Sequence, residues 1–599
     1  MTTAAPEDLR WDLTPWFDRF DGPAYRTFVE TFLQDLADLQ KAAADLPPLD
    51  VAHVDPWADH LVRMEALGVR GSHIGSYLGC LSAADTTNEA VNEAYAQLST
   101  WRSEQQKLRV RVIAGLRPAS DTAFQKLAAD ARLVGCMYYL ERLRHEAKWS
   151  MPTDLELLAA DLNVDGLSAW GRLYDSIAGT LTFDMPGRKV PMAQKISLLE
   201  DRDPAIRRAT LENSNAAWTT VEDNVAMALN GIAGTRLTLD RWRGVPHFLD
   251  EALFDAGITR QTLDTLLGVA AKNRDMVRRY LKLKARLLGL DKLGYQDTSC
   301  PVPLADDERL TWNDAKARVL GAFRQSYPAL AEFAEMALDK HWVEAEARPG
   351  KRPGGFCSSS YLAKESRVFM TFTGTSGEAQ TLAHELGHAW HTWLMRDLRA
   401  WARSYPMTLA ESASTFAETL VTDALLSDPQ APPRVKAGLL NLRLDDAVAY
   451  LLNVPMRFTF EKAFYEARQQ GSVRASRLKS LVLEAQREWF GDGVDPEQLD
   501  PMFWASKLHF YITGVRFYNF PYVFGYLFSL GLFARFKQQG PAFFRQYEDL
   551  LRLTGSHEVE EVARRALGVD LQKPDYWQAS VDLVANDLDH FEAVVKACG

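Results

Sequence analysis

The sequence predicts a mainly α-helical protein with more than one domain. Apolar residues recur at the spacing of amphipathic helices through most of the chain, and only two short segments have β character. A length of 599 residues allows a large buried core and several domains. The 47% hydrophobic and 25% charged residues are typical of ordered globular proteins and argue against disorder.

The N-terminal part is predicted to consist of helices. An apolar stripe with steps of 3, 4, 4 and 3 residues predicts a first helix, and its positions are Tyr25, Phe28, Phe32, Leu36 and Leu39. This helix is expected to end at Pro47–Pro48. A second helix is expected to start after Asp85 and to run beyond Trp101, and the same pattern continues over residues 108–173.

A short hairpin then interrupts the helical pattern. The β-rich residues 180–183 and 189–192 flank a Pro186–Gly187 turn signal. We place a domain boundary here, so that residues 1–190 form an N-terminal helical domain and residues 191–599 form a second, larger domain. Helical patterns resume at Leu198 and persist through Leu288.

Charge, cysteines and hydropathy restrict the partners and the compartment. A net charge of −11 argues against nucleic acid as a partner. Five scattered cysteines without a C-x-x-C pair fit a reducing compartment, and residues 1–10 show no secretory signal. Polar residues, Pro and Gly interrupt the most apolar run, Phe517–Phe533, which is also shorter than the about 20 residues of a membrane span. We therefore expect a buried helix there, and a cytoplasmic protein that binds neither membrane nor nucleic acid.

A turn-rich segment precedes the second β segment. Residues 349–357 lack the G-x-x-x-x-G-K-[ST] spacing of a phosphate loop, which argues against nucleotide binding. Residues 367–372 alternate and predict a strand, along whose edge an extended peptide could pair. Thr375 and Glu378 have the spacing of a capping box and predict the start of the next helix.

That helix carries the most informative motif of the chain. His384 and His388 lie four residues apart and therefore project from one helix face, which provides half of a zinc site. Glu385 lies about 100° around the helix and can reach over the metal without binding it. This is the H-E-x-x-H pattern, in which the glutamate is the general base of a metal-dependent peptidase. The alternative is two histidines on an ordinary surface helix.

A catalytic zinc site usually needs a third protein ligand. The metzincin pattern fails, because His391 stands where glycine should be and Leu394 where the third histidine should be. Glu411, 23 residues after His388, is expected to start an antiparallel return helix that carries it back to the metal. Glu418 shares its face and could orient a ligand histidine. For both glutamates the alternative is a solvated helix residue.

Several motifs together resemble one known family. The stretch T-L-A-H-E-L-G-H-A-W-H (381–391), followed by E-S-A-S-T-F-A-E (411–418), is similar to the oligoendopeptidase F branch of the thimet oligopeptidase family of zinc metallopeptidases. The G-K-R-P-G-G-F loop (350–356) and the His-Phe-Tyr and Tyr-rich segment (509–526) agree with it. The similarity covers residues 195–590 well and the N-terminal part more loosely.

The resemblance implies roles for individual residues. One zinc ion would be bound by His384, His388 and Glu411. Glu385 would take a proton from the attacking water and pass it to the leaving amine. His509 matches the family histidine that contacts the scissile carbonyl or its oxyanion.

The resemblance also implies a role for a tyrosine cluster, Tyr518, Tyr522 and Tyr526. Tyr522 and then Tyr518 are the preferred candidates for a donor to the oxyanion. For each tyrosine the alternative is a core aromatic residue. His391 is left out of the metal site.

The implied fold is a mainly α, zincin-type metallopeptidase. A small β element would lie beside the H-E-x-x-H helix, and a deep channel between two mostly helical parts would admit short unfolded peptides. The expected activity is zinc-dependent hydrolysis of internal bonds of oligopeptides. The alternative is a zinc carboxypeptidase or dipeptidyl carboxypeptidase, which needs a cationic anchor such as Arg516 or Arg352. The sequence does not indicate an oligomeric state.

Overall fold

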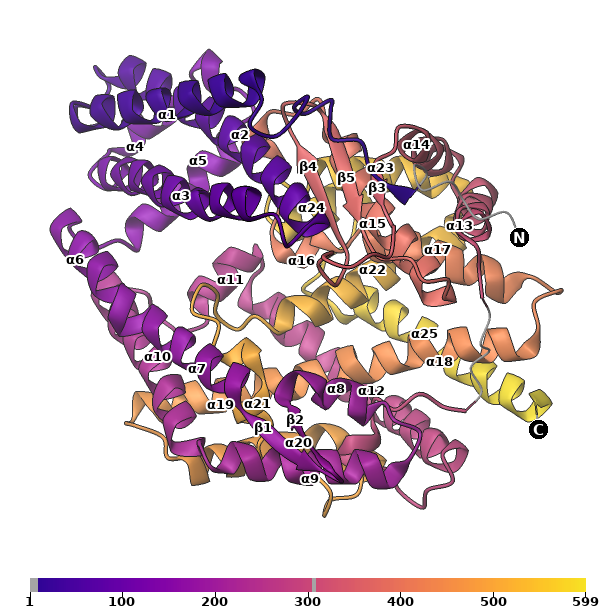
Figure 1. The fold of residues 1–599 in the computed structure, drawn as a ribbon. Coiled ribbons are helices and arrows are strands. Elements are labelled where there is room, and N and C mark those ends of the chain that lie inside the picture. The colour runs from indigo at the N-terminus through magenta and orange to yellow at the C-terminus, as the bar shows by residue number, and fades with distance from the viewer. Residues whose placement is uncertain (1–8, 304–308, 599) are drawn as a thin grey trace. The chain divides into compact units, whose positions relative to one another are not determined.

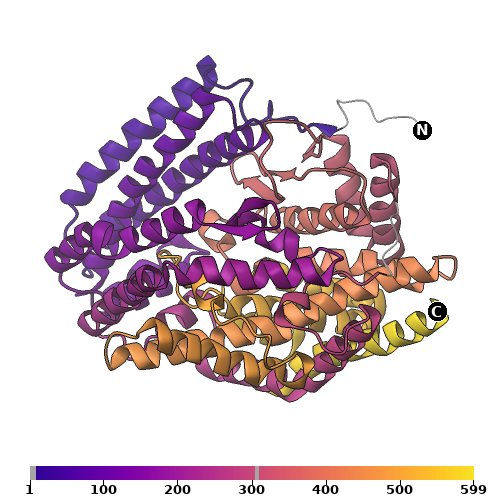
Figure 2. The ribbon, with the colours of Figure 1, turned by 60° about the horizontal axis from the view of Figure 1, so that its bottom comes forward.

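The computed structural model describes residues 9–303 and 309–598 and is mainly helical (Figures 1 and 2). The described chain forms two compact units, each built from three segments. Unit 1 contains the described residues within 1–150, 307–427 and 535–568, and unit 2 contains those within 151–306, 428–534 and 569–599. The first eight residues, part of the stretch without a secretory signal, lie outside the described residues. The domain boundary expected at residues 190/191 stays a prediction.

Unit 1 begins with helices that were expected from the sequence. The apolar stripe of the first helix is confirmed, since Tyr25, Phe32, Leu36 and Leu39 are buried. The helices of this unit are α1 (Pro23–Ala44), α2 (Val54–Ala84), α3 (Glu89–Leu116), α4 (Asp121–Ala128), α5 (Met137–Lys148), α13 (Trp312–Ser326), α14 (Pro328–Asp339), α15 (Ser376–Leu394), α16 (Met407–Ala410), α17 (Ser414–Ser427), α23 (Phe543–Leu553) and α24 (Val559–Leu567).

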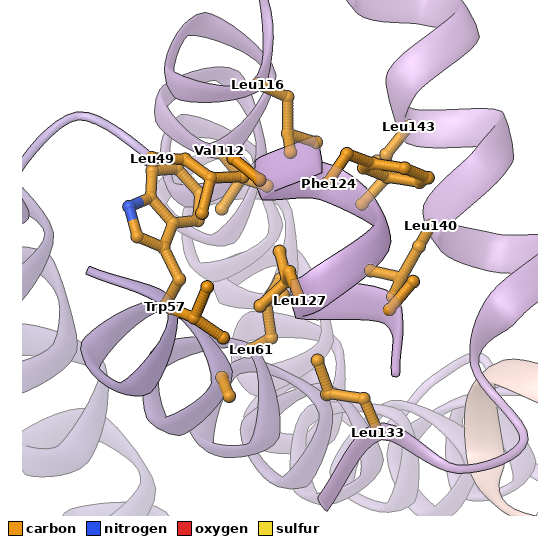
Figure 3. Packing of buried hydrophobic residues seen from close by; sticks show 14 of the residues in the cluster. Leu49, Trp57, Leu61, Val112, Leu116, Phe124, Leu127, Leu133, Leu140 and Leu143 are labelled. Atoms are coloured by element: carbon orange, nitrogen blue, oxygen red, sulfur yellow. The ribbon is translucent and has the colours of Figure 1, made fainter. Parts of the chain in front are cut away.

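A hydrophobic cluster joins four of these helices (Figure 3). Trp57 of α2 is 2% exposed, and its indole nitrogen donates a hydrogen bond to the backbone oxygen of Pro47. Leucine and phenylalanine side chains of α3, α4 and α5 pack in the same cluster. Burial of this apolar surface, rather than helix propensity, stabilises the N-terminal helices.

A three-stranded sheet lies in the same unit. Its order is β3 (Val343–Glu344), β5 (Glu365–Phe369), β4 (Phe356–Ser360), with β3 parallel and β4 antiparallel to β5. The strand expected at 367–372 is therefore central, and the expected peptide pairing along its edge is wrong because both its edges are already paired. Among the described strands, β4 pairs only with β5, so β4 has the outer edge.

Unit 2 contains the predicted hairpin and the remaining helices. Strands β1 (Thr182–Met185) and β2 (Arg188–Pro191) pair antiparallel around the expected turn, where Gly187 has a φ of +78°. The helices are α6 (Thr153–Asn163), α7 (Ala169–Thr180), α8 (Lys195–Leu199), α9 (Pro204–Thr219), α10 (Glu222–Arg243), α11 (Asp250–Ala256), α12 (Arg260–Leu287), α18 (Pro433–Val448), α19 (Val454–Gln469), α20 (Ala475–Phe490), α21 (Phe503–Ser506), α22 (Phe520–Gln539, which continues into unit 1) and α25 (Pro574–Cys598).

The apolar run at 517–533 forms most of α22. Phe520, Val523, Phe524, Leu527 and Phe528 are each at most 1% exposed, as expected for a buried helix. No helix within the described residues is long and apolar enough to cross a membrane.

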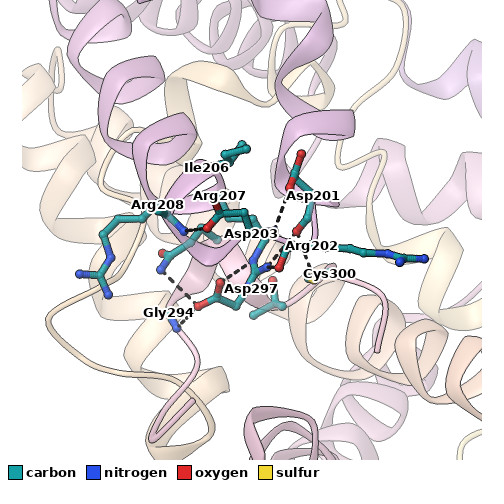
Figure 4. A network of polar contacts seen from close by, with 12 residues as sticks. Asp201, Arg202, Asp203, Ile206, Arg207, Arg208, Gly294, Asp297 and Cys300 are labelled. Carbon is teal, nitrogen blue, oxygen red and sulfur yellow. Dashed lines mark hydrogen bonds and ion pairs between the residues drawn. The ribbon is translucent and has the colours of Figure 1, made fainter. Parts of the chain in front are cut away.

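A buried ion pair links α9 to the segment that follows α12 (Figure 4). The guanidinium of Arg207 donates from Nε to Asp297 at 2.7 Å and from Nη1 to the backbone oxygens of Asp201 and Arg202. Asp297 also accepts from the backbone nitrogen of Gly294 at 2.8 Å. Because both partners are almost fully buried, each charge depends on the other for solvation.

We predict that Asp297→Asn lowers the free energy of unfolding by about 3–5 kcal/mol, because it leaves the Arg207 charge buried without its partner. Urea denaturation measures this change. The control is Asp184→Asn, which removes an exposed ion pair to Lys189 and is expected to change stability by less than about 1 kcal/mol. Equal effects of the two substitutions would show that the buried pair does not stabilise the fold.

Candidate active site

Helix α15 begins at the predicted capping box. The Thr375 hydroxyl accepts from the backbone nitrogen of Glu378, and the Glu378 carboxylate accepts from the backbone nitrogens of Thr375, Gly374 and Thr373. Four donors at the helix start are thereby satisfied. The motif helix is therefore fixed at its N-terminus, directly after the sheet.

The structure brings His384, His388 and Glu411 together. One ligand atom from each residue lies within 4.8 Å of the others. Oε2 of Glu411 is 3.3 Å from Nε2 of His384 and 3.4 Å from Nε2 of His388. Two imidazoles and one carboxylate thus converge on a single point, as in a catalytic metal site.

Glu411 reaches this point from a turn rather than from a helix. α15 already ends at Leu394, and the expected return helix is divided into the short α16 and α17, with Glu411 directly after α16. Its carboxylate accepts from the Ser414 hydroxyl at 2.7 Å. The expectation that Glu411 starts the return helix is therefore wrong in detail, since the chain needs a turn to aim this carboxylate at α15.

Gly387 permits this approach. A Cβ atom on Gly387 would lie 2.6 Å from the carbonyl oxygen of Ala413 and 2.6 Å from Cα of Ser414. Both are backbone atoms, which cannot move aside like the end of a side chain. The glycine between Glu385 and His388 therefore allows the Glu411 turn to pack directly on the motif helix.

Glu418 supports the site from the opposite side of His384. Its Oε2 lies 3.3 Å from Nδ1 of His384, while Nε2 of His384 faces Glu411. A hydrogen bond at Nδ1 fixes the ring and leaves the Nε2 lone pair available to a metal.

The charges in the site favour a bound cation. Burial lowers the pKa of His384, but the carboxylates of Glu411 and Glu418 outweigh it and raise that pKa to about 10. Although burial also opposes it, the two histidines hold the pKa of the Glu411 carboxyl well below its usual range. The donor set and its negative charge fit a divalent metal ion with one coordination position left for water.

Glu385 lies beside this cluster but is not one of its three candidate metal ligands. Its side chain is 6% exposed, and among the described residues its Oε2 has no hydrogen-bond partner. Burial raises the pKa of its carboxyl, and Glu411 adds to this effect while the two histidines oppose it. A carboxylate of raised basicity next to a metal site is suited to accept a proton from water.

A cavity of about 470 Å³ opens over these residues within unit 1. Sequence reasoning missed several of its lining residues, because they come from distant segments that carry no motif. The lining consists of Ser72, Gly355, Phe356, Cys357, Ser359, Tyr361, His384, Glu385, His388, Thr392, Tyr405 and Glu411. Three of these residues belong to β4, so the outer strand of the sheet, not β5, forms a wall of the cavity.

His391 is fully buried, and its imidazole ring is held by contacts with other protein groups. Its Nε2 bonds the backbone oxygen of Leu551 at 3.1 Å and the hydroxyl of Thr554 at 2.9 Å, and its ring stacks on Tyr405. Burial lowers its pKa to about 3. These contacts explain a histidine in the motif helix that is not part of the metal cluster.

The remaining candidates lie in unit 2. The rings of His509, Tyr518 and Tyr522 are mutual neighbours, with centroids 5.3–5.9 Å apart. Tyr526 stacks instead on Tyr450.

The two candidate anchors of a carboxypeptidase differ in their contacts. Arg516 is bound by Asp240 at 2.7 Å and by Glu251 at 2.5 Å, so its charge is already neutralised. The guanidinium of Arg352 lies over the Phe356 ring, 4.9 Å from its centroid.

Comparison with protein-family models identifies two matching regions. Residues 324–583, which include the motif helix and the Glu411 turn, match the model of peptidase family M3. Residues 118–183 match the N-terminal model of oligopeptidase F. Residues 324–583 therefore belong to peptidase family M3.

Two bacterial relatives are similar in sequence to this chain, at low identity. An oligoendopeptidase F homologue of Lactococcus lactis is 25% identical over 72% of this chain and 73% of the relative. The oligopeptidase PepF of Bacillus subtilis is 23% identical over 67% of this chain and 59% of the relative.

Solved structures show the same fold. A crystal structure of oligoendopeptidase F from Enterococcus faecium has a TM-score of 0.70 at 20% identity, over 96% of this chain and 99% of that one. A protein of Chlamydophila abortus reaches a TM-score of 0.84 at 19% identity, over 98% of both chains.

Family membership and the histidine–glutamate cluster agree. The protein is a metallo-oligopeptidase that hydrolyses peptide bonds, and its family uses a metal ion for this reaction. The resemblance seen in the motifs is confirmed, as is the mainly α-helical fold with a small sheet beside the motif helix.

We predict that Gly387→Ala lowers the free energy of unfolding by about 1–3 kcal/mol, because the added methyl meets backbone atoms. The bound metal measured by elemental analysis should fall as well, since the Glu411 turn is pushed away from the two histidines. The control is Gly321→Ala in α13, where a Cβ meets nothing within 4 Å. Full metal content in the Gly387 variant would show that the close approach is not needed for the site.

Proposed function

We propose that the protein is a zinc-dependent endopeptidase that hydrolyses internal bonds of short unfolded oligopeptides. The observation that carries this proposal is the convergence of His384, His388 and Glu411 beside the buried Glu385. The names of the relatives, oligoendopeptidase F and oligopeptidase, support the substrate class and internal cleavage.

His384, His388 and Glu411 would hold one zinc ion. When bound, zinc acts as a Lewis acid and lowers the pKa of water toward about 7. Glu385 accepts a proton as the water oxygen bonds to the peptide carbonyl carbon. It then delivers this proton to the nitrogen as the carbon–nitrogen bond breaks. Glu418 holds His384 in the orientation that this arrangement needs.

His509, Tyr518 and Tyr522 are proposed to act on the carbonyl side of the scissile bond. Their close grouping supports a shared role. A hydrogen bond that strengthens as negative charge develops on the carbonyl oxygen lowers the barrier of the reaction. Tyr522 is the first candidate for this donor and Tyr518 the second.

The outer edge of β4 is proposed to hold the substrate backbone. The carbonyl of Ser359 is taken by the hydroxyl of Ser76 at 3.0 Å, so the outward-facing backbone at Cys357 is the position next to the cavity where a peptide can pair. The glycine-rich loop before β4 brings Gly355 to Glu385, where a Cβ would lie 3.1 Å from Oε1. A main-chain contact of this kind binds peptides with little regard to their side chains.

We also propose a cytoplasmic location. The described thiols of Cys80, Cys136, Cys300 and Cys357 are free, as expected in a reducing compartment. Cell fractionation tests this, and recovery in a secreted fraction would contradict it.

Mass spectrometry of a mixed peptide library tests the function as a whole. We expect cleavage at internal bonds, including in peptides amidated at the C-terminus, and loss of all cleavage with a zinc chelator that zinc restores. Removal of only C-terminal residues or dipeptides would favour the carboxypeptidase alternative. Activity that persists in metal-free protein would refute the zinc mechanism.

Two substitutions separate metal binding from proton transfer. We predict that Glu385→Gln keeps its zinc and loses about 100- to 10,000-fold in kcat, because only the proton acceptor is removed. Glu411→Ala should lose zinc itself, because it removes one of three ligands. Zinc content and kcat are measured on both variants. Normal turnover in the first, or full zinc occupancy in the second, would move the respective role to another residue.

A further inference from the structure

A buried amide in unit 2 connects His509 to a carboxyl group of α19. Oδ1 of Asn519 lies 2.8 Å from Nδ1 of His509, and Asn519 is 1% exposed. On its other side, the Asn519 side chain lies close enough to Glu461 to lower the pKa of that carboxyl. Nδ2 of Asn519 and Oε2 of Glu461 are both buried, and neither has a hydrogen-bond partner among the described residues, so each is the group that the other lacks. Donor and acceptor therefore complement each other.

Three neighbours determine the orientation of the Asn519 amide. Glu461 is an acceptor and requires the NH₂ group on its side. Arg457 is a donor, and its Nη1 lies 3.4 Å from Oδ1. With Oδ1 facing His509, the hydrogen of the imidazole must be on Nδ1, because an amide oxygen only accepts.

The surroundings of Glu461 are mainly apolar, and the polar groups that act on its carboxyl are Arg236, Asn519 and the backbone of Phe517. It is 5% exposed and lies among Ile232, Phe460, Phe464 and Phe510. Burial raises the pKa of its carboxyl to about 7, against the opposing charge of Arg236. A carboxyl kept in an apolar core at this cost in solvation has a reason other than packing.

The loop between His509 and Asn519 is held rigidly. Arg236, 3% exposed, donates to the backbone oxygens of Ile512, Thr513 and Val515. Phe517 has a φ of +48°, which is strained for a bulky residue and persists only when the surroundings impose it. Its ring packs against Phe248, Phe458 and Tyr465.

His509 is neutral at physiological pH. Burial and the charges of Lys507 and Arg457 lower its pKa to about 4, and the hydrogen bond to Asn519 opposes this only in part. A neutral imidazole with its hydrogen on Nδ1 presents a lone pair at Nε2.

We propose that Asn519 is a positioning residue for His509, held in turn by Glu461, and that this chain of groups makes Nε2 of His509 a hydrogen-bond acceptor. The inference rests on the proposed catalytic role of His509 and deepens it. The hydrogen bond donated to the developing oxyanion then comes from Tyr518 or Tyr522. His509 instead accepts from a substrate N–H or from one of the tyrosine hydroxyls.

Kinetics of single and double variants test the proposal. Asn519→Leu should lower kcat/KM by about 10- to 100-fold, mostly in kcat, as is typical when the partner of a functional histidine is removed. In a His509→Ala background the same substitution should have no further effect, because its action passes through His509. Independent, multiplying losses would overturn the positioning role.

A matched control and a rescue variant exclude a merely structural effect. Asn230→Leu removes another buried amide of unit 2, whose hydrogen-bond partners within the described chain are backbone groups of Ala226 and Val473. This variant should leave kcat/KM of the folded enzyme unchanged. The double variant Glu461→Gln/Asn519→Asp exchanges amide and carboxylate and should recover most of the activity lost in Asn519→Leu.

The pH dependence of kcat/KM provides a second measurement on the Glu461→Gln/Asn519→Asp variant. A carboxylate directly on Nδ1 raises the pKa of His509, so the acid limb of the kcat/KM profile should move to higher pH. The charges that face these groups, Lys507, Arg457 and Arg236, are unchanged in this variant. An exchange that neither rescues activity nor moves the acid limb would contradict the proposal.

The ¹⁵N chemical shifts of the imidazole ring show which nitrogen of His509 carries the hydrogen, and this measurement does not depend on activity. For His509, assigned by its loss in His509→Ala, we expect a protonated Nδ1 and an unprotonated Nε2 in the native chain, and a mixture of both tautomers in Asn519→Leu. A protonated Nε2 in the native chain would overturn the inference. If His509→Ala keeps full activity, the catalytic role of His509 fails, and the ¹⁵N shifts still decide whether Asn519 sets its tautomer.

Discussion

The close packing of the Glu411 turn on the motif helix is the constraint on which the site depends. Two histidines on one helix face supply only half of a metal site, and the missing carboxylate comes from a segment beyond the end of that helix. The turn can reach the histidines because Gly387 leaves no Cβ between the two backbones. The three candidate ligands can therefore converge only when the Glu411 turn packs closely on α15.

Polar contacts around the cluster give each carboxylate a different environment. Glu411 faces both Nε2 atoms and accepts from Ser414, whereas Glu418 contacts Nδ1 of His384. Oε2 of Glu385 has no hydrogen-bond partner within the described parts of the chain, and burial raises the pKa of this carboxyl. Three carboxylates that look alike in the sequence thus have three environments, and the environment determines whether each can bind a metal, orient a ligand or accept a proton.

The second unit shows the same principle in a network of buried polar groups. His509 is positioned by an amide, the amide is held by a buried carboxyl, and the loop between them is fixed by Arg236 and by the strained backbone at Phe517. Such a chain of buried polar groups is costly unless every member is satisfied. It is therefore expected where the direction of a single hydrogen bond matters.

The sequence by itself determined the helical class, the hairpin, the capping box and the family, because these depend on local periodicity and on residue spacing within single segments. It also singled out His384, Glu385, His388 and Glu411, since their residue types and spacing follow from the chemistry of zinc.

The tertiary structure alone decided which strand is at the edge of the sheet, that Glu411 lies in a turn, that Tyr526 stacks on Tyr450, and that Glu461 lies next to Asn519. Each of these depends on contacts between segments far apart in the chain. Such contacts are set by packing and burial, which have no period or spacing that can be found in a single segment.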